Sequence, residues 1–214
     1  MLTPPQRERA ADGLSQLIAR THQWAIKGRT VLTEMLQGEP TPKAWQHWPN
    51  DDAHDRQTGF RWFYHAHASG GRTRGEHGHF HLFADTHEAE RVTHLVAVSV
   101  DARGLPCGLF APNRWVTDEH WSSAAFVIER LAVFELRAPD VLRPVHQWLA
   151  WLVGAFGPQI EAVLHARDER LAELRLRLRS DVPEDRRIAV LSRCPISLAT
   201  QAHHLDRWRG LRLT

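Results

Sequence analysis

Two short runs of residues between positions 59 and 83 constrain the fold of this chain more than any other part of its sequence. The first run, residues 59–67, reads GFRWFYHAH, and the second, residues 76–83, reads EHGHFHLF. Both are rich in aromatic residues, which favour β-strands. Residues 68–75 between them hold three glycines and no apolar residue larger than alanine, a composition typical of a loop. The two runs therefore predict a β-hairpin.

Histidines share one face of this predicted hairpin. Side chains alternate between the two faces of a strand with a period of two, so five histidines fall on the same side: His65, His67, His77, His79 and His81. Phe63 and Phe83 bracket them there, and the opposite face is strongly apolar. Two registers keep all five together. One pairs His65 with His79, and the other pairs His65 with His81.

This pattern predicts a metal site. Directly opposed Cβ atoms lie about 4.5–5.5 Å apart, so two opposed imidazoles and a third two residues along can bind one ion at about 2.0–2.1 Å per bond. Buried imidazoles without partners are costly, and a metal is a partner to several at once. We expect at least three of the five to bind one divalent transition metal, Fe or Zn before Cu or Mn. The alternative is a polar strand face turned to solvent.

Glu76 is a candidate catalytic residue beside these histidines. It directly precedes His77, so a regular strand points it to the other face, and only a bulge or the strand end would redirect it. As a ligand it would complete the two-histidine, one-carboxylate set of non-haem iron sites. The alternative is an ion pair with Arg72 or Arg74.

Arg114 is the second candidate catalytic residue. It follows the fourth predicted strand, and its guanidinium could bind a substrate carboxylate through two hydrogen bonds. Glu119 could serve as an acid or base, but we favour a helix start there, with Thr117 as the cap and Glu119 in the first turn.

The remaining sequence predicts helices around a small sheet. Residues 1–38 show helical spacing of apolar residues, and residues 39–58 look irregular. Strands over residues 94–100 and 105–111 complete a four-stranded antiparallel sheet within residues 59–112. Helices follow over residues 120–134, 139–156, 160–179, 182–193 and 197–208. The prediction is one α+β domain over residues 1–214, with the helical region at 120–214.

Composition narrows the function classes. The net charge is +2, too weak a bias to indicate nucleic-acid binding. Residues 182–193 and 197–208 have helix-turn-helix spacing, but acids dilute their arginines, so we favour packing on the sheet. Two cysteines are too few for a disulfide scaffold. No apolar run is long enough to span a membrane, and the first residues lack a signal-peptide core. We expect a cytoplasmic protein with a small-molecule substrate, and a homodimer stays open.

Part of the first strand is similar to the cupin metal motif. Gly59 is followed after five residues by His65, Ala66 and His67, as in that motif. A cupin then has a glutamate three or four residues later, whereas the next one here is Glu76. The second cupin motif has a histidine after Pro-x-Gly, whereas residues 106–108 are followed by none. The likeness implies convergence on a metal-binding strand.

A wider resemblance covers about half of the chain. YHAH at residues 64–67 and EHGHFH at residues 76–81, with NRWVT at residues 113–117, resemble an uncharacterised family of bacterial proteins. This resemblance implies no activity, so the chemistry of the histidines decides the expectation. We expect a metal-dependent enzyme that activates water or oxygen at a mononuclear site, of the non-haem iron oxidoreductase or zinc hydrolase type. The alternatives are a non-catalytic metal-handling protein and a metal-free ligand- or nucleic-acid-binding module.

Overall fold

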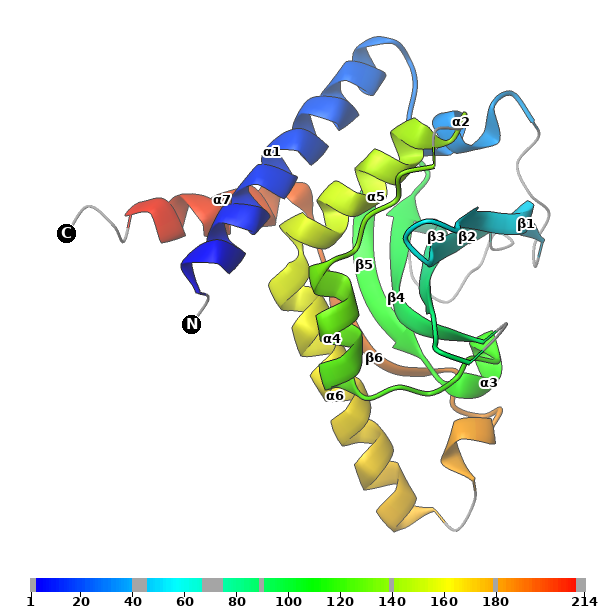
Figure 1. Cartoon of the computed structure of the whole chain (residues 1–214). Helices are drawn as coiled ribbons and strands as arrows, with labels where there is room; N and C mark the ends of the chain where they lie inside the picture. The colour runs from blue at the N-terminus through cyan, green and yellow to red at the C-terminus, as the bar shows by residue number, and fades with distance from the viewer. Residues whose placement is uncertain are drawn as a thin grey trace.

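A six-stranded antiparallel sheet forms the centre of the computed structural model (Figure 1). The structure describes residues 3–39, 46–66, 75–88, 91–138, 141–178 and 181–210. The strands follow one another across the sheet in chain order: β1 (His47–Asp55), β2 (Phe60–Ala66), β3 (Glu76–Asp85), β4 (Val92–Asp101), β5 (Pro106–Pro112) and β6 (Val190–Pro195). The α+β class and the four predicted strands, here β2 to β5, are confirmed. The two edge strands, β1 and β6, were not predicted.

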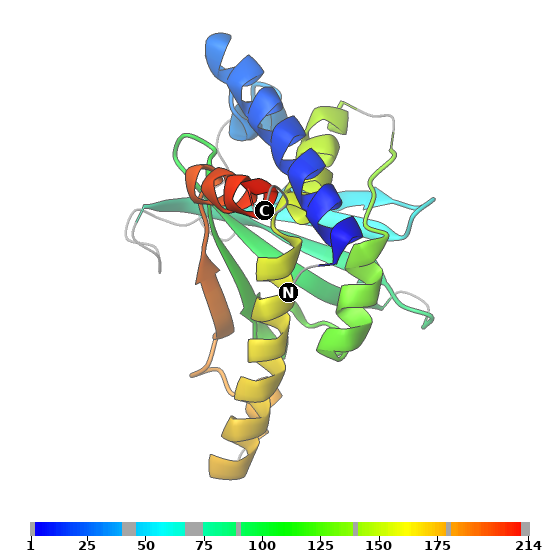
Figure 2. The same ribbon diagram turned by 90° about the vertical axis from the view of Figure 1, so that its left-hand side faces the viewer.

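Helices cover one face of this sheet (Figures 1 and 2). They are α1 (Pro4–Ile26), α2 (Val31–Leu36), α4 (Ala124–Ala132), α5 (Arg143–Ala155), α6 (Gly157–Arg177) and α7 (Leu198–Gly210), with the short helix α3 (Arg114–Thr117) and the 3-10 turn η1 (Val182–Glu184) near the sheet's lower end. The core lies between the helices and the sheet. Phe80 packs edge-on against Trp62 at 5.5 Å and tilts against Trp148 of α5 at 6.0 Å between ring centroids.

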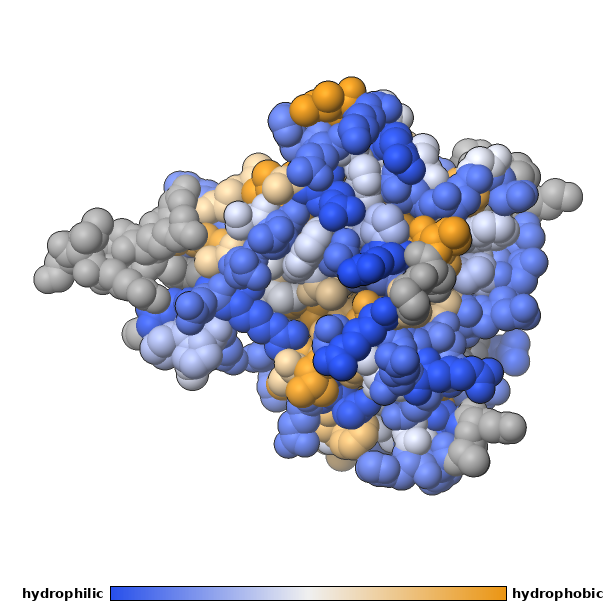
Figure 3. All heavy atoms as spheres, turned by 45° about the horizontal axis from the view of Figure 1, so that its top comes forward, coloured by the Kyte–Doolittle hydropathy of each residue, from blue (hydrophilic) through white to orange (hydrophobic). Residues whose placement is uncertain are grey.

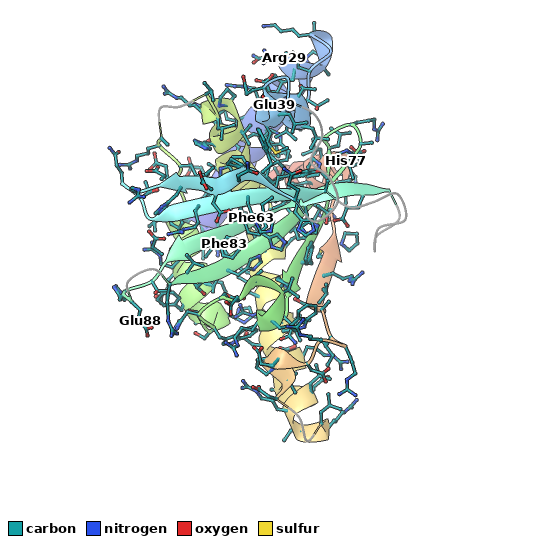
Figure 4. The ribbon with its side chains drawn as sticks, turned by 90° about the vertical axis from the view of Figure 1, so that its right-hand side faces the viewer. Arg29, Glu39, Phe63, His77, Phe83 and Glu88 are labelled. Atoms are coloured by element: carbon teal, nitrogen blue, oxygen red, sulfur yellow. The ribbon has the colours of Figure 1, made fainter. Side chains whose placement is uncertain are left out.

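The alternation of side chains therefore divides the hairpin between two environments. Trp62, Tyr64 and Phe80 point into the helix-covered core and are fully buried. Phe63 and Phe83 belong to the other face and stack at 5.5 Å. Figure 4 looks onto this second face, where both phenylalanines lie close together on neighbouring strands. This face carries the candidate site.

The outer surface over the first helices is largely hydrophilic. Figure 3 shows small, separate apolar patches on this side of the molecule. Ile18 of α1 is 40% exposed and Ile26, the last residue of α1, is 72% exposed. Scattered exposed apolar residues are ordinary on a protein surface.

Three predictions about secondary structure are wrong. The helix over residues 1–38 is broken, because Gly28 adopts a left-handed φ of +64° and the Thr30 side chain caps α2. Residues 182–193 form no α-helix: they contain the 3-10 turn η1 and most of β6, which pairs with β5. The segment expected to be irregular contains β1, an edge strand whose polar residues, Pro49 and register shift hide the usual strand pattern.

Candidate metal centre

The register of β2 and β3 brings three histidines together. His65 lies opposite His79, and Phe63 lies opposite His81, so the first of the two registers left open by the sequence is the observed one. One ligand nitrogen from each of His65, His79 and His81 lies within 4.8 Å of the other two. His79 and His81 are 6% and 2% exposed. These three residues are called the histidine triad below.

His77 does not join the triad, contrary to the prediction. The pairing of β3 with β4 shifts between Glu76 and Gly78, and this irregularity ends the strict alternation. The Nδ1 atom of His77 instead shares a hydrogen bond of 2.6 Å with the Tyr64 hydroxyl, and Tyr64 belongs to the core face. In Figure 4 His77 lies apart from Phe63 and Phe83, toward the other end of the hairpin. His67, also predicted, lies outside the described residues.

The same irregularity turns Glu76 toward the triad. Its Oε1 atom lies 2.7 Å from Nδ1 of His79, and its side chain is only 5% exposed. A carboxylate in this position accepts the Nδ1 hydrogen and fixes both the tautomer and the orientation of the ring. Glu76 therefore reaches this face through a bulge, the condition that the sequence set for its role beside the histidines.

Two histidines that the sequence did not assign to the site lie next to it. His94 of β4 reaches the same face because the β3–β4 pairing shifts again after Leu82, and its Nε2 atom lies 3.0 Å from Nδ1 of His81. His47 of β1 pairs with His65 across the strands and stacks on Phe63 at 3.9 Å. Neither could be found by strand parity, because one follows a bulge and the other lies in a segment that lacked a strand pattern.

Burial keeps the inner histidines neutral. It lowers the pKa of His94 to about 3, and the positive charge of Arg167 adds to the effect. Burial also lowers the pKa of His81 well below its usual value, with His79 and His94 as further causes. A neutral imidazole has one donor and one acceptor nitrogen. One of the two rings can therefore donate a hydrogen bond to the other between Nδ1 of His81 and Nε2 of His94, and this bond fixes the orientation of both rings.

Glu119 is a buried acid behind His94. Its carboxylate accepts a hydrogen bond of 2.6 Å from the His94 backbone N–H, and its side chain is almost fully enclosed. Thr117, predicted to cap a helix there, instead ends α3 and lies 3.3 Å from the Glu119 carboxylate. Desolvation raises the pKa of Glu119 from 4.5 to about 7, although the His94 N–H and Arg167 oppose the rise.

This shift predicts a pH-dependent loss of stability. Because the folded state holds the Glu119 proton more tightly, the contribution of Glu119 to stability is fully present below pH 4.5 and is lost as the pH rises through about 7. At about 1.36 kcal/mol per pKa unit, the loss is about 3 kcal/mol. The Glu119→Gln variant has no ionisable group at this position. The unfolding free energy of the variant minus that of wild type should therefore increase by about 3 kcal/mol between pH 4.5 and pH 8. Urea unfolding with chelator present measures this difference. A constant difference across this range would contradict the assignment.

A cavity of about 480 Å³ opens beside the triad. The triad, His47, Phe63 and Glu76 line part of it, together with Ser99 of β4 and residues of β5, β6 and α3. This volume lies within the usual range for small-molecule sites, about 300–1,000 Å³. Cys107 also lines the cavity. Burial, with the nearby carboxylates of Glu76 and Asp101, raises the pKa of its thiol to about 11, so the thiol is protonated at neutral pH.

Arg114 is not brought to the histidines. Its guanidinium forms an ion pair of 2.5 Å with Glu184 of η1. The next two residues, Trp115 and Val116, line the cavity, but Arg114 does not. The predicted contact of Arg114 with a substrate carboxylate therefore has no counterpart in this arrangement.

Comparison with known proteins identifies the family of the chain. A family model described as a domain of unknown function (DUF6969) matches residues 11–196. No curated protein and no solved structure matches the chain. Within the described residues, no helix combines the length and the apolar character needed to cross a membrane.

Proposed function

The chain belongs to the DUF6969 family, whose function is unknown, and from its site we propose that it is a metal-dependent enzyme acting on a small molecule. One divalent transition-metal ion is bound by His65, His79 and His81, and the substrate occupies the adjoining cavity. The observation that carries the proposal is the triad itself: three ligand nitrogens within 4.8 Å of one another, on the wall of a cavity of about 480 Å³.

The triad fits a metal in geometry and in chemistry. Nitrogens bound tetrahedrally at about 2.1 Å lie about 3.4 Å apart, so small rotations of the three rings bring them into place. Neutral imidazoles suit iron, zinc and copper, and burial favours the neutral form of His81. With Nδ1 of His79 and His81 engaged by Glu76 and His94, these two residues would bind the ion through Nε2.

Three protein ligands are typical of a catalytic site. Structural zinc sites are usually closed by four ligands, whereas catalytic sites keep a position for water or substrate. When bound here, the ion would act as a Lewis acid or activate water or oxygen. The chain's own residues would hold the ligands and shield the site: Glu76 orients His79, His94 orients His81, and the Phe63 ring, stacked on His47, forms an apolar wall.

Cobalt titration of protein purified without a histidine tag tests this proposal. We expect one equivalent of Co²⁺ to bind, with visible absorption bands that shift when azide is added, because an open coordination position accepts the anion. Uptake of several equivalents would support a metal-handling role instead. Binding of one equivalent of Co²⁺ with absorption bands that do not shift on addition of azide would indicate a closed structural site. No uptake of Co²⁺, Zn²⁺ or Fe²⁺ would refute the metal centre.

Because Glu76 contacts His79, replacing Glu76 should moderately weaken metal binding. Carboxylates that hold a ligand histidine typically contribute about 10- to 100-fold to affinity, so Glu76→Gln should weaken Zn²⁺ binding by about that factor in a competition titration with a chromophoric chelator. Glu88→Gln is the matched control, since the Glu88 side chain is 59% exposed and pairs with Arg91. Equal affinities for Glu76→Gln and wild type would show that this carboxylate does not support the ligand.

A further inference from the structure

One positively charged side chain stands out in the cavity. Of the described residues that line it, Arg193 alone carries a permanent positive charge. The buried Arg167 and the partly exposed Arg114 both pair with acids. The backbone of Arg193 pairs with β5, and its side chain is exposed and makes no hydrogen bond, ion pair or ring contact with any residue in the described ranges. Its guanidinium is thus available at the cavity wall.

Strand pairing places Arg193 at the far end of a row that begins at the triad. His81 lies opposite Ala97, Ala97 opposite Phe110, and Phe110 opposite Arg193. Adjacent strands are about 4.8 Å apart, so the row spans about 14 Å from β3 to β6. A ligand bound at both ends would therefore lie across the strands, with its long axis along the row.

Between the two ends the cavity is lined by Ser99, Gly108 and Phe110. A second row crosses the same strands through His79, Ser99 and Gly108. A Cβ atom at Gly108 would meet no atom closer than 3.4 Å, so the backbone tolerates a side chain there. Because Gly108 lines the cavity, that side chain would fill part of it. The Phe110 ring packs edge-on against His79 at 4.9 Å and offers an apolar surface beside it.

The charges in the cavity favour an anion. Glu76 is the one acid among the described lining residues, and it contacts His79. A planar guanidinium binds a carboxylate through two parallel hydrogen bonds. A largely apolar pocket with a few placed polar groups fixes the orientation of its ligand in this way.

Deepening the proposed function, and resting on it, we propose that the substrate is a small carboxylic acid with an elongated apolar body. Its carboxylate pairs with Arg193, its apolar body lies over Phe110 and Gly108, and the end remote from the carboxylate reaches the triad. Gly108 sets how bulky that body can be.

Calorimetry on the zinc-loaded protein tests this assignment with a matched pair of probes, decanoate and its uncharged analogue decanamide. Hydrogen bonds to charged groups favour decanoate by about 10-fold or more, so decanoate should bind correspondingly tighter. Arg193→Gln should remove this preference and leave decanamide binding unchanged. Gly108→Leu should weaken both probes. Arg114→Gln, the matched control outside the cavity, should change neither, and all three variants should keep one equivalent of zinc.

Two results would overturn the pairing of a substrate carboxylate with Arg193. One is equal affinity of wild type for the two probes. The other is a decanoate preference that survives Arg193→Gln but disappears when His65 and His81 are both replaced by alanine, because the carboxylate would then bind at the metal. Zinc content is measured separately on each sample. Failure of zinc binding would refute the metal centre, whereas equal affinity of zinc-loaded wild type for the two probes would refute the carboxylate assignment and leave the metal centre standing.

Discussion

Replacing His65 and His81 together by alanine is expected to abolish stoichiometric metal binding. The double variant keeps one imidazole of the triad, and a single imidazole cannot hold the ion in competition with water. In wild type, a metal at about 100 times its dissociation constant should add about 2.7 kcal/mol to the unfolding free energy, because it binds only the folded state. For a chain of this length that corresponds to a rise of about 5–10 °C in Tm. The double variant should show no rise with added Zn²⁺ or Co²⁺.

The matched control is His77→Ala, on the same strand as His79 and His81. Because the His77 ring is turned to the Tyr64 hydroxyl, its removal should leave the metal-induced rise in Tm intact. Each variant is compared with and without metal, so any change in its intrinsic stability cancels. A rise that persists in the double variant, or one that vanishes in His77→Ala, would contradict the assigned ligands.

Gly78→Ala is expected to lower the unfolding free energy by about 2–3 kcal/mol. A Cβ atom there would lie 2.5 Å from the His65 carbonyl oxygen and would also overlap the Tyr64 hydroxyl. The carbonyl belongs to the paired backbone of β2 and cannot move away cheaply, so overpacking has to be absorbed by the sheet. Because the strained segment positions His65 and His79, the variant should also bind metal more weakly. Urea unfolding and a zinc competition titration measure the two effects.

Gly157→Ala is the control for this substitution. Gly157 begins α6, and a Cβ atom there would meet nothing within 4 Å. Alanine is the better helix former by about 1 kcal/mol, so this variant should be as stable as wild type or slightly more stable. An unfolding free energy of Gly78→Ala equal to that of wild type would contradict the close approach of the Tyr64 hydroxyl and the His65 carbonyl oxygen to Gly78.

The hairpin and the shared face of its histidines could be predicted because strand parity is a local property, whereas the sequence left two registers open and the structure selects the one that pairs His65 with His79. The alternation of His65, His79 and His81 with apolar residues needs only the period of a strand. The exclusion of His77 could not be predicted, because the irregularity between Glu76 and Gly78 arises from pairing with β4, a partner more than ten residues away. The same shift explains why a carboxylate predicted to point elsewhere contacts His79.

Strand β6 and its cavity residue Arg193 could not be predicted for a different reason. Residues 182–193 have helical spacing, so the sequence predicts a helix there and places Arg193 outside the sheet. The structure shows that residues from Val190 onward pair with β5 instead, so tertiary pairing overrides local propensity. The sequence therefore favoured Arg114, which is nearer to the predicted strands but pairs with Glu184.

The most direct test of the metal centre is anomalous diffraction from crystals of the untagged protein grown with Zn²⁺ and measured at the zinc absorption edge. We predict one strong peak about 2.0–2.1 Å from a nitrogen of each of His65, His79 and His81, with at least one further coordination position facing the cavity. A zinc ion enclosed by four protein ligands with no adjoining cavity would contradict the catalytic proposal, and no peak at the triad would contradict the metal centre itself.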